Sequence, residues 1–423
     1  MLKPSHLLVL ATLALTTVTL AGQAPATERL QAGFATDRVG VIDRALQAYV
    51  DTERVAGIVA LVVQDGQVVY EKALGWADRE AGRKMTTDTI FRIASQTKAV
   101  TSAAVLQLIE DGKLTLGTRV GTLISTFAKT TVATASDAGT VTMEPARRAI
   151  TIKDLLTHTA GISYGTDRSV AALYEAAGLG PAAGNGWYTA DKEEPICTTM
   201  ERLGTLPFVA QPGERFVYGY NTDILGCIVE KVSGTSLDEY VRTKITAPLG
   251  LADTQFFLPE SGRNRLAAVY ASGPGGKYVR SPEGPKGQGH YVDGPRKSFA
   301  GGAGLLSTAR DYARFLEMMR RGGSLDGVRV LSPGSVKLMS TNQSGDVRPP
   351  AAGLGFGLGF ETVDRFGAKG MSSVGTFGWG GAYGSVYRVD PEARLVIVLM
   401  IQLMPNATDL QDVFANLVYS AVR

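Results

Sequence analysis

The sequence predicts an α+β protein whose antiparallel sheet is built from the two ends of the chain. Strand-like runs rich in β-branched residues occur near the start of the chain and again near its end. The long middle part shows short helical patterns joined by Gly/Pro/Ser-rich connections. We therefore expect a discontinuous sheet subdomain, 30–115 and 300–423, flanked by helices, with a mostly helical subdomain, 116–299, inserted into it.

The first residues have the features of an export signal. Lys3 precedes an apolar run over 7–20, and small residues follow it. The run is short for a membrane span, which needs about 20 residues. We expect a signal peptide over 1–24, cut within 21–26, and an exported protein, periplasmic or secreted, with no stable membrane insertion after processing. An uncleaved anchor is the alternative.

The N-terminal elements follow from local patterns. Residues 41–50 have apolar side chains at helical spacing. Two β-rich runs, 58–63 and 68–70, flank Asp65-Gly66, a strong hairpin signal. Residues 99–109 are apolar on nearly every face and stop at a glycine, which describes a buried helix.

The middle of the chain is less regular. Short helical patterns appear at 152–156 and 224–232, and no strand is evident between about 115 and 300. Residues 271–296 are rich in Gly and Pro and predict one long loop.

Clear patterns return toward the C-terminus. Thr308 and Asp311 form a capping box before an amphipathic helix. The runs 385–389 and 395–401 read as two strands joined by a turn, and 410–418 as a final helix.

Composition narrows the function. The chain has 423 residues, 44% hydrophobic and 20% charged, which is ordinary for a globular protein and excludes a disordered or fibrous one. The net charge is +3 without a basic block, so nothing points to nucleic acid. Two cysteines, Cys197 and Cys227, cannot build a zinc cluster, and whether they pair stays open. With only three histidines, a chemistry that does not depend on imidazole is favoured, and we expect no metal or cofactor.

Ser95 and Lys98 open the predicted buried helix. Residues three apart on a helix point in similar directions, so the hydroxyl and the amine can share one pocket. The positive end of the helix dipole favours an oxyanion there and disfavours an ammonium. A neutral lysine can then activate a serine without histidine. A Ser and a Lys at this spacing also arise by chance. The pair indicates a catalytic site only because the helix that carries it is predicted to be buried.

Two further segments fit this chemistry. Tyr218 lies just before the apolar helix 224–232, where a phenol can relay a proton. The run 378–382, Gly-Trp-Gly-Gly-Ala, precedes a predicted strand, and its glycines allow a ligand to approach the backbone closely. Either segment alone has a structural explanation, a packed tyrosine or a β-bulge.

Five motifs in order resemble the serine β-lactamase/penicillin-binding-protein superfamily, in its class C-like branch and closest to the family VIII carboxylesterases. They cover most of the chain from about 40 to 405 and include 91–98, 155–161, 212–218, 304–312 and 379–381. The resemblance implies a β-lactamase/transpeptidase-like fold. It implies Ser95 as nucleophile, Lys98 as base and Tyr218 as proton relay, with an oxyanion hole from the N–H groups of Ser95 and Ala382.

The same resemblance implies a substrate-binding strand at Trp379, Gly380 and Gly381. Trp379 stands where β-lactamases carry a lysine that helps bind a carboxylate, and Tyr220 stands where they carry an asparagine. Since Trp supplies no charge for a carboxylate, both departures favour neutral esters, and Tyr220 is expected to contact the substrate.

Other motifs compete less well. Ser163 sits in Gly-x-Ser-x-Gly, but a nucleophile elbow requires a preceding strand and here a helical pattern precedes it. We expect His158 to pack in a loop and His290 to lie in the Gly/Pro loop, where the sequence shows no partner for it. The run Ser340-Thr341-Asn342 reads as a helix end.

Together these observations predict an exported serine hydrolase that cleaves short-chain carboxylic esters through a Ser95 acyl-enzyme. Its partner would be a small-molecule ester, with a β-lactam or D-amino-acid amide possible. A β-lactamase or D-amino-acid peptidase is the first alternative, and a penicillin-binding-like protein without turnover is the second. The sequence leaves the oligomeric state open.

Overall fold

A computed structural model describes residue 1 and residues 33–135, 141–179, 190–347 and 353–423. The predicted signal peptide therefore lies almost wholly outside the described residues. Among the described residues, no helix combines the length and apolar composition that crossing a membrane needs.

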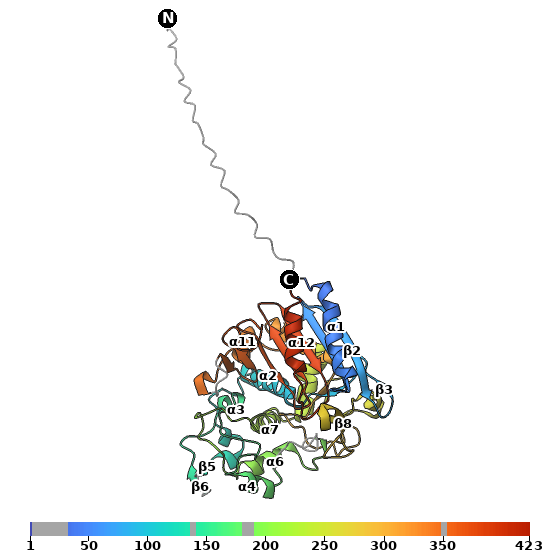
Figure 1. Cartoon of the computed structure of the whole chain (residues 1–423). Helices are drawn as coiled ribbons and strands as arrows, with labels where there is room; N and C mark the ends of the chain where they lie inside the picture. The colour runs from blue at the N-terminus through green and yellow to red at the C-terminus, as the bar shows by residue number, and fades with distance from the viewer. Residues whose placement is uncertain (2–32, 136–140, 180–189, 348–352) are drawn as a thin grey trace.

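An eight-stranded antiparallel sheet joins the two ends of the chain, as predicted (Figure 1). Its strand order is β12-β13-β14-β15-β16-β1-β2-β3, so the N-terminal β1 pairs directly with the C-terminal β16. The strands are β1 (Gly57–Gln64), β2 (Gln67–Asp78), β3 (Arg83–Lys84), β12 (Leu354–Phe356), β13 (Glu361–Val363), β14 (Phe377–Gly380), β15 (Val386–Asp390) and β16 (Leu395–Met400).

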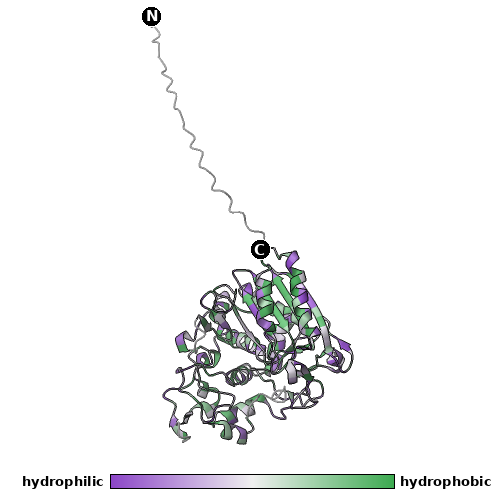
Figure 2. Ribbon diagram, in the orientation of Figure 1, coloured by the Kyte–Doolittle hydropathy of each residue, from purple (hydrophilic) through white to green (hydrophobic). Residues whose placement is uncertain are grey.

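Helices cover both faces of this sheet. On one face lie α1 (Thr36–Asp51) and α12 (Leu410–Tyr419), which pack against each other (Figure 1). On the other face lie α2 (Thr97–Glu110) and α10 (Ala309–Arg320). Because helices cover both faces of β1, all of its residues are buried. The central strands of the sheet appear as a continuous apolar band (Figure 2).

Local chemistry explains the first and last elements. The turn between β1 and β2 places Asp65 and Gly66 at φ of 51° and 80°, which the Asp-Gly pair tolerates well. Thr308 caps α10 by accepting from the N–H of Asp311. Asp311 does not complete the predicted capping box in return, because its carboxylate accepts from the N–H of Asp253 instead.

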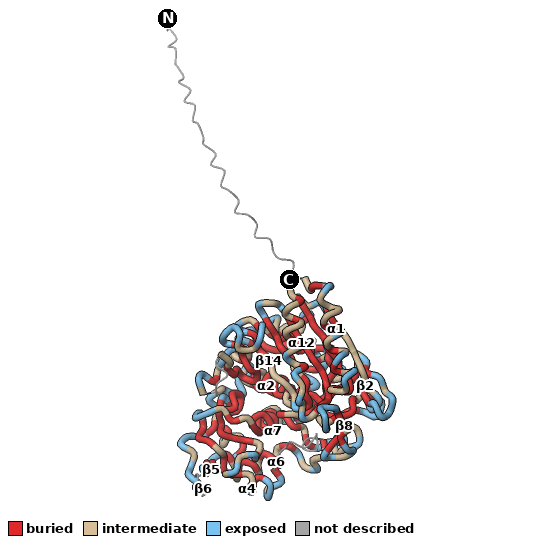
Figure 3. The backbone as a smooth tube through the Cα atoms, in the orientation of Figure 1, coloured by how far each residue is buried: buried red, intermediate tan, exposed pale blue. Residues whose placement is uncertain are grey.

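The second part of the molecule is mostly helical. Its helices are α3 (Ile152–Leu156), α4 (Ala171–Ala176), α6 (Ile196–Leu203), α7 (Asn221–Ser233), α8 (Leu237–Val241) and α9 (Ala247–Leu249); α11 (Pro333–Ser340) follows α10. α7 packs against α2, and buried residues continue without a break from the sheet into this part (Figure 3).

The prediction that strands are absent between 115 and 300 is wrong. A hairpin joins β5 (Thr131–Ala135) to β6 (Val141–Pro145), and a second joins β7 (Tyr270–Ser272) to β8 (Tyr278–Arg280). The second hairpin begins the stretch predicted as one long loop. Both hairpins are short and stand apart from the main sheet, so their sequences carry little of the alternation that marks a strand.

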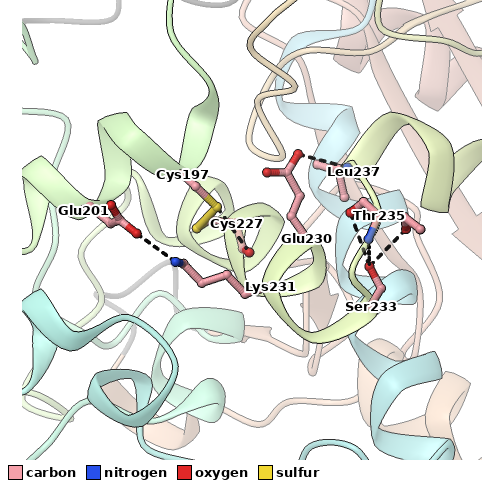
Figure 4. Close-up of a disulfide and its surroundings, with 8 residues drawn as sticks. All are labelled: Cys197, Glu201, Cys227, Glu230, Lys231, Ser233, Thr235 and Leu237. Carbon is pink, nitrogen blue, oxygen red and sulfur yellow. Dashed lines mark hydrogen bonds and ion pairs between the residues drawn. A yellow bond between two sulfur atoms is a disulfide. The ribbon is translucent and has the colours of Figure 1, made fainter.

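A disulfide joins Cys197 of α6 to Cys227 of α7, which answers the question the sequence left open (Figure 4). The ion pair between Glu201 and Lys231 links the same two helices. α7 is thus fixed on one side by the disulfide and on the other by its packing against α2, the helix that begins beside Ser95.

Candidate active site

Ser95 lies at the sharp entry to α2. The short 3-10 turn Ala94–Gln96 precedes the helix, and Ala94 has a φ of 44°, in the left-handed region that L-residues rarely adopt. Ser95 is partly exposed there and lines a cavity of about 410 Å3. Such local strain is common where a reacting side chain must be presented.

Lys98, one turn along α2, is buried beside it. Its Nζ lies 3.3 Å from the Ser95 Oγ, 3.0 Å from the Tyr164 hydroxyl and 2.7 Å from the Gly302 carbonyl oxygen. The carbonyl can only accept, and the tyrosine hydroxyl can accept as well. A neutral amine that donates its two hydrogens to these oxygens has its lone pair left for the Ser95 hydroxyl.

The Gly302 carbonyl is itself held in place. The buried Asp223 of α7 accepts from the Gly302 N–H at 2.9 Å. A side chain at Gly302 would meet that carboxylate at 2.5 Å, so only glycine allows this approach. Asp223 thereby fixes an acceptor of Lys98.

Tyr164 is a site residue that the sequence analysis missed. Burial, reinforced by Tyr218, Asp223 and Tyr220, raises the pKa of Tyr164 well above its ordinary value, so it remains a neutral hydroxyl. The Gly-x-Ser-x-Gly pattern drew attention to the preceding residue, Ser163, which is buried and accepts from the Gly165 N–H. The residue of this segment that contacts Lys98 is therefore Tyr164, one position after the serine of the pattern.

Tyr218 lies beside Lys98 and contacts the ring of Tyr164. Its ring centroid lies 4.7 Å from the Lys98 Nζ, and its hydroxyl accepts from the indole N–H of Trp379 at 3.2 Å. Both aromatic residues line the cavity together with Ser95. Trp379 thus offers Tyr218 a neutral hydrogen-bond donor.

Gly381, directly after β14, lies against the segment that leads into α2. A side chain at Gly381 would lie 2.5 Å from the Ile93 carbonyl oxygen, so the backbones can approach closely only with glycine there. Gly380, Gly381 and Ala382 all line the cavity that contains Ser95. The predicted oxyanion and substrate-binding segments are therefore adjacent to the predicted nucleophile.

Tyr220 does not occupy the place expected of it. It is buried, its hydroxyl donates to the Leu179 carbonyl, and its ring contacts Tyr164 at 4.9 Å between centroids. It is absent from the lining of the cavity. In place of the predicted contact with substrate, Tyr220 packs against the ring of Tyr164. It directly precedes α7, which begins at Asn221, and its side chain points into the protein.

The other candidate residues do not line the cavity with Ser95, although the ring of His158 packs against Tyr218 at 4.8 Å between centroids. His158 is buried and its Nδ1 is hydrogen-bonded to Asn221, which agrees with the packing role expected of it. His290 pairs with Asp191, outside the long loop, so the expectation that it has no partner is wrong. The Ser340 hydroxyl donates to Val336 at the end of α11, again as expected of a helix end. Within the described part of the chain, no three His, Cys, Asp or Glu side chains gather closely enough to hold a metal ion.

Comparison with known proteins identifies the family. The family model described as Beta-lactamase matches residues 42–419. The chain belongs to the beta-lactamase family. A partly exposed serine one helical turn before a buried lysine agrees with membership of this family of serine hydrolases.

Three similar proteins, two compared by sequence and one by structure, include an esterase and another hydrolase. An uncharacterized protein of Mycobacterium tuberculosis is 36% identical over 84% of this chain and 88% of its own length. Esterase EstB of Burkholderia gladioli is 31% identical over 85% of this chain and 88% of its own. The solved structure of EstCE1, described as a hydrolase with promiscuous acyltransferase activity, aligns with a TM-score of 0.74 at 26% identity, covering 91% of this chain and 97% of that one. The predicted fold and a hydrolase activity are thereby confirmed.

Proposed function

We propose that this hydrolase is an exported carboxylesterase that cleaves short-chain esters through an acyl-enzyme on Ser95. The arrangement around Lys98 carries the proposal. Two fixed oxygen acceptors orient the Lys98 amine, so that the lone pair of its deprotonated form is directed at the Ser95 hydroxyl, 3.3 Å away. This is the geometry required of a general base that acts without histidine.

In this mechanism the Ser95 Oγ attacks the ester carbonyl carbon while its proton passes to the Lys98 Nζ. The oxyanion that forms accepts from the N–H groups of Ser95 and Ala382, both at the cavity wall. Tyr218 then passes the proton to the leaving alkoxide, and the alcohol departs. Water attacks the acyl-enzyme by the reverse proton route and releases the acid.

The choice of ester over β-lactam rests on Trp379. It lines the cavity beside Ser95 and offers an indole N–H, already directed at Tyr218, where a lysine ammonium would attract a carboxylate. The similarity to Esterase EstB supports the same choice.

Export is supported by two features. The apolar run near the N-terminus has the composition of a signal peptide. The disulfide between Cys197 and Cys227 is of a kind that persists in oxidising compartments and is rare in a reducing cytosol.

The proposal is tested by assaying the mature protein with a chromogenic butyrate ester and a chromogenic cephalosporin at equal enzyme concentration. We expect ester turnover to exceed cephalosporin turnover by far. It should vanish in Ser95→Ala and persist in Ser163→Ala, the matched control. Equal or faster cephalosporin turnover would instead favour a β-lactamase, and loss of activity only in Ser163→Ala would overturn the site.

A further inference from the structure

His158 is buried against Tyr218, the residue assigned as the proton relay, although it does not line the cavity that contains Ser95. The centroids of the two rings are 4.8 Å apart, with 38° between the ring planes. At this distance two tilted aromatic rings attract each other. His158 therefore contacts the relay without contacting the space in which the substrate would bind.

This contact belongs to a closed cycle of four rings. From Tyr218 the cycle continues to Trp379 at 5.5 Å between centroids, then to Phe356 at 5.4 Å, and returns to His158 at 5.5 Å. Trp379 and Phe356 belong to β14 and β12 of the sheet, whereas His158 follows α3 and Tyr218 precedes α7. The relay thus lies where the two parts of the molecule meet, with rings from both parts against it.

The His158 ring is itself held by Asn221, the first residue of α7. The Asn221 amide nitrogen lies 2.9 Å from the His158 Nδ1 and 3.2 Å from each of the Ile162 and Val217 carbonyl oxygens. Because carbonyls only accept, the group that faces them is the amide NH2 and not the amide oxygen. The His158 Nδ1 then accepts as well, so the ring is neutral and carries its proton on Nε2.

The backbone on both sides of Tyr218 is fixed against the segment that carries His158. The N–H of Val217 donates to the His158 carbonyl oxygen at 2.7 Å. A side chain at Gly219 would lie 2.2 Å from the Ile162 carbonyl oxygen, so the chain passes this close only with glycine there. With the backbone fixed in this way, the direction of the Tyr218 side chain depends on what its ring contacts.

We propose that His158 is a positioning residue whose neutral ring, oriented by Asn221, holds Tyr218 in the alignment that proton relay requires. The inference rests on the proposed function and deepens it, because His158 acts only through the relay of that site. The Tyr218 hydroxyl accepts from the Trp379 indole N–H, and its ring lies 4.7 Å from the Lys98 Nζ. A ring without the support of His158 would lose both relations, and proton transfer requires donor and acceptor within hydrogen-bond reach.

This role predicts a dependence on the leaving group. As the C–O bond of the tetrahedral intermediate breaks, the Tyr218 proton passes to the departing oxygen. The Lys98 ammonium, which holds the proton taken from Ser95, restores it. A p-nitrophenolate departs as a stable anion and needs no proton, whereas an alkoxide is a strong base and needs one. A misaligned Tyr218 therefore slows cleavage of an alkyl ester and leaves cleavage of a nitrophenyl ester nearly unchanged.

The test compares p-nitrophenyl butyrate with ethyl butyrate. Both esters form the same butyryl-enzyme, and kcat/KM reports the barrier to forming it from free enzyme and ester. The quantity measured is the ratio of kcat/KM for the nitrophenyl ester to that for the ethyl ester, with both assayed on one enzyme preparation. Because unfolded protein lowers both rates equally, this ratio does not depend on the fraction of enzyme that is folded.

His158→Asn removes the ring and introduces a residue that tolerates the left-handed backbone at this position, where φ is 56°. We expect it to raise the ratio about tenfold, by slowing cleavage of the ethyl ester alone. Tyr218→Phe, which removes the relay itself, should raise the ratio by roughly 10²-fold or more, as for loss of general acid catalysis. His158→Phe keeps a ring against Tyr218 without the bond to Asn221 and should give a smaller rise than His158→Asn.

Two further variants separate positioning from packing. Phe208→Leu removes a buried ring that stacks on Phe127 in the helical part. It should lower stability and leave the ratio unchanged. The double variant His158→Asn/Tyr218→Phe should show the ratio of Tyr218→Phe alone, since a positioning residue has no effect once the residue that it positions is gone.

An unchanged ratio in His158→Asn, beside a raised ratio in Tyr218→Phe, would overturn the positioning role and leave the esterase and its relay intact. A further rise in the double variant, or an equal rise in Phe208→Leu, would also overturn it. An unchanged ratio in Tyr218→Phe would reject the relay and the positioning role together. No turnover of either ester by the wild type would instead reject the proposed function itself.

Discussion

Lys98 has three oxygen neighbours, and they do not have equal roles. The Gly302 carbonyl accepts regardless of protonation state, whereas Tyr164 contributes a hydroxyl that stays neutral because burial raises its pKa. Tyr164 is thus an acceptor that orients the lysine, while Tyr218, with its hydroxyl engaged by Trp379, is the candidate proton relay.

Tyr164→Phe removes this acceptor and keeps the ring. We expect kcat to fall about fivefold, as for the loss of one hydrogen bond of about 1 kcal/mol, with KM nearly unchanged. Steady-state kinetics with the butyrate ester give the measurement. Tyr220→Phe is the control, since it changes the buried tyrosine behind Tyr164, and an equal loss in both variants would show that the effect is only structural.

Trp379→Phe tests the indole N–H separately from the aromatic surface. Losing one hydrogen bond of about 1 kcal/mol should lower kcat about fivefold and leave KM for a butyrate ester almost constant. Trp379→Leu, which also removes the aromatic contact with Tyr218, should in addition raise KM. If Trp379→Phe matched wild type, the hydrogen bond to Tyr218 would have no part in turnover.

Among the elements, α3 is short but strongly capped. Thr151 and Asp154 form a reciprocal capping box, and Arg148 binds the Asp154 carboxylate through two nitrogens at 2.6 and 2.8 Å. Burial alone would raise the pKa of Asp154, but the hydrogen bonds from Arg148 and Thr151 outweigh it and hold that pKa below 3.8. The helix leads into the segment that carries His158 and Tyr164.

The depressed pKa fixes the sign of a pH effect. Stability from the Asp154 carboxylate is complete above its ordinary pKa, 3.8, and is lost as the pH falls through the lower folded value. Asp154→Asn should therefore reduce the free energy of unfolding by about 1–3 kcal/mol at pH 7, and by progressively less below pH 3.8. Urea unfolding across this range gives the comparison, and a penalty that grows toward acid would contradict the assignment.

At the scale of the whole molecule, the disulfide links α6 to α7, the helix that packs against α2. It closes a sequence separation of 30 residues, for which a chain-entropy model gives about 3.6 kcal/mol. The double variant Cys197→Ala/Cys227→Ala should lose about that much stability in urea unfolding. Wild type treated with a thiol reductant should behave in the same way, whereas an unchanged unfolding midpoint in both would show that the bond contributes nothing.

Much of the sheet could be predicted because its central strands are long and apolar. β1, β2, β15 and β16 were all expected, as were α1, α2, α10 and α12. β12 and β13 were not, because strands of three residues give no measurable alternation. The pairing of β1 with β16 followed from their positions at opposite ends of the chain and not from any local signal.

The site was predictable where its residues sit in local motifs. Ser95, Lys98 and Tyr218 were named from such motifs, and the structure places them around one cavity or its buried wall. Tyr164, Asp223 and Gly302 come together only through the packing of α2 and α7, which no spacing in the sequence encodes.

The central claim is that Ser95 becomes acylated, and trapping the covalent intermediate tests it most directly. The mature protein would be treated with a p-nitrophenyl phosphonate, an ester mimic that stops at the covalent stage, and digested for peptide mass mapping. The account predicts one adduct per chain on the peptide that contains Ser95, formed equally in Ser163→Ala and absent in Ser95→Ala. An adduct on Ser163, or one that persists in Ser95→Ala, would contradict it.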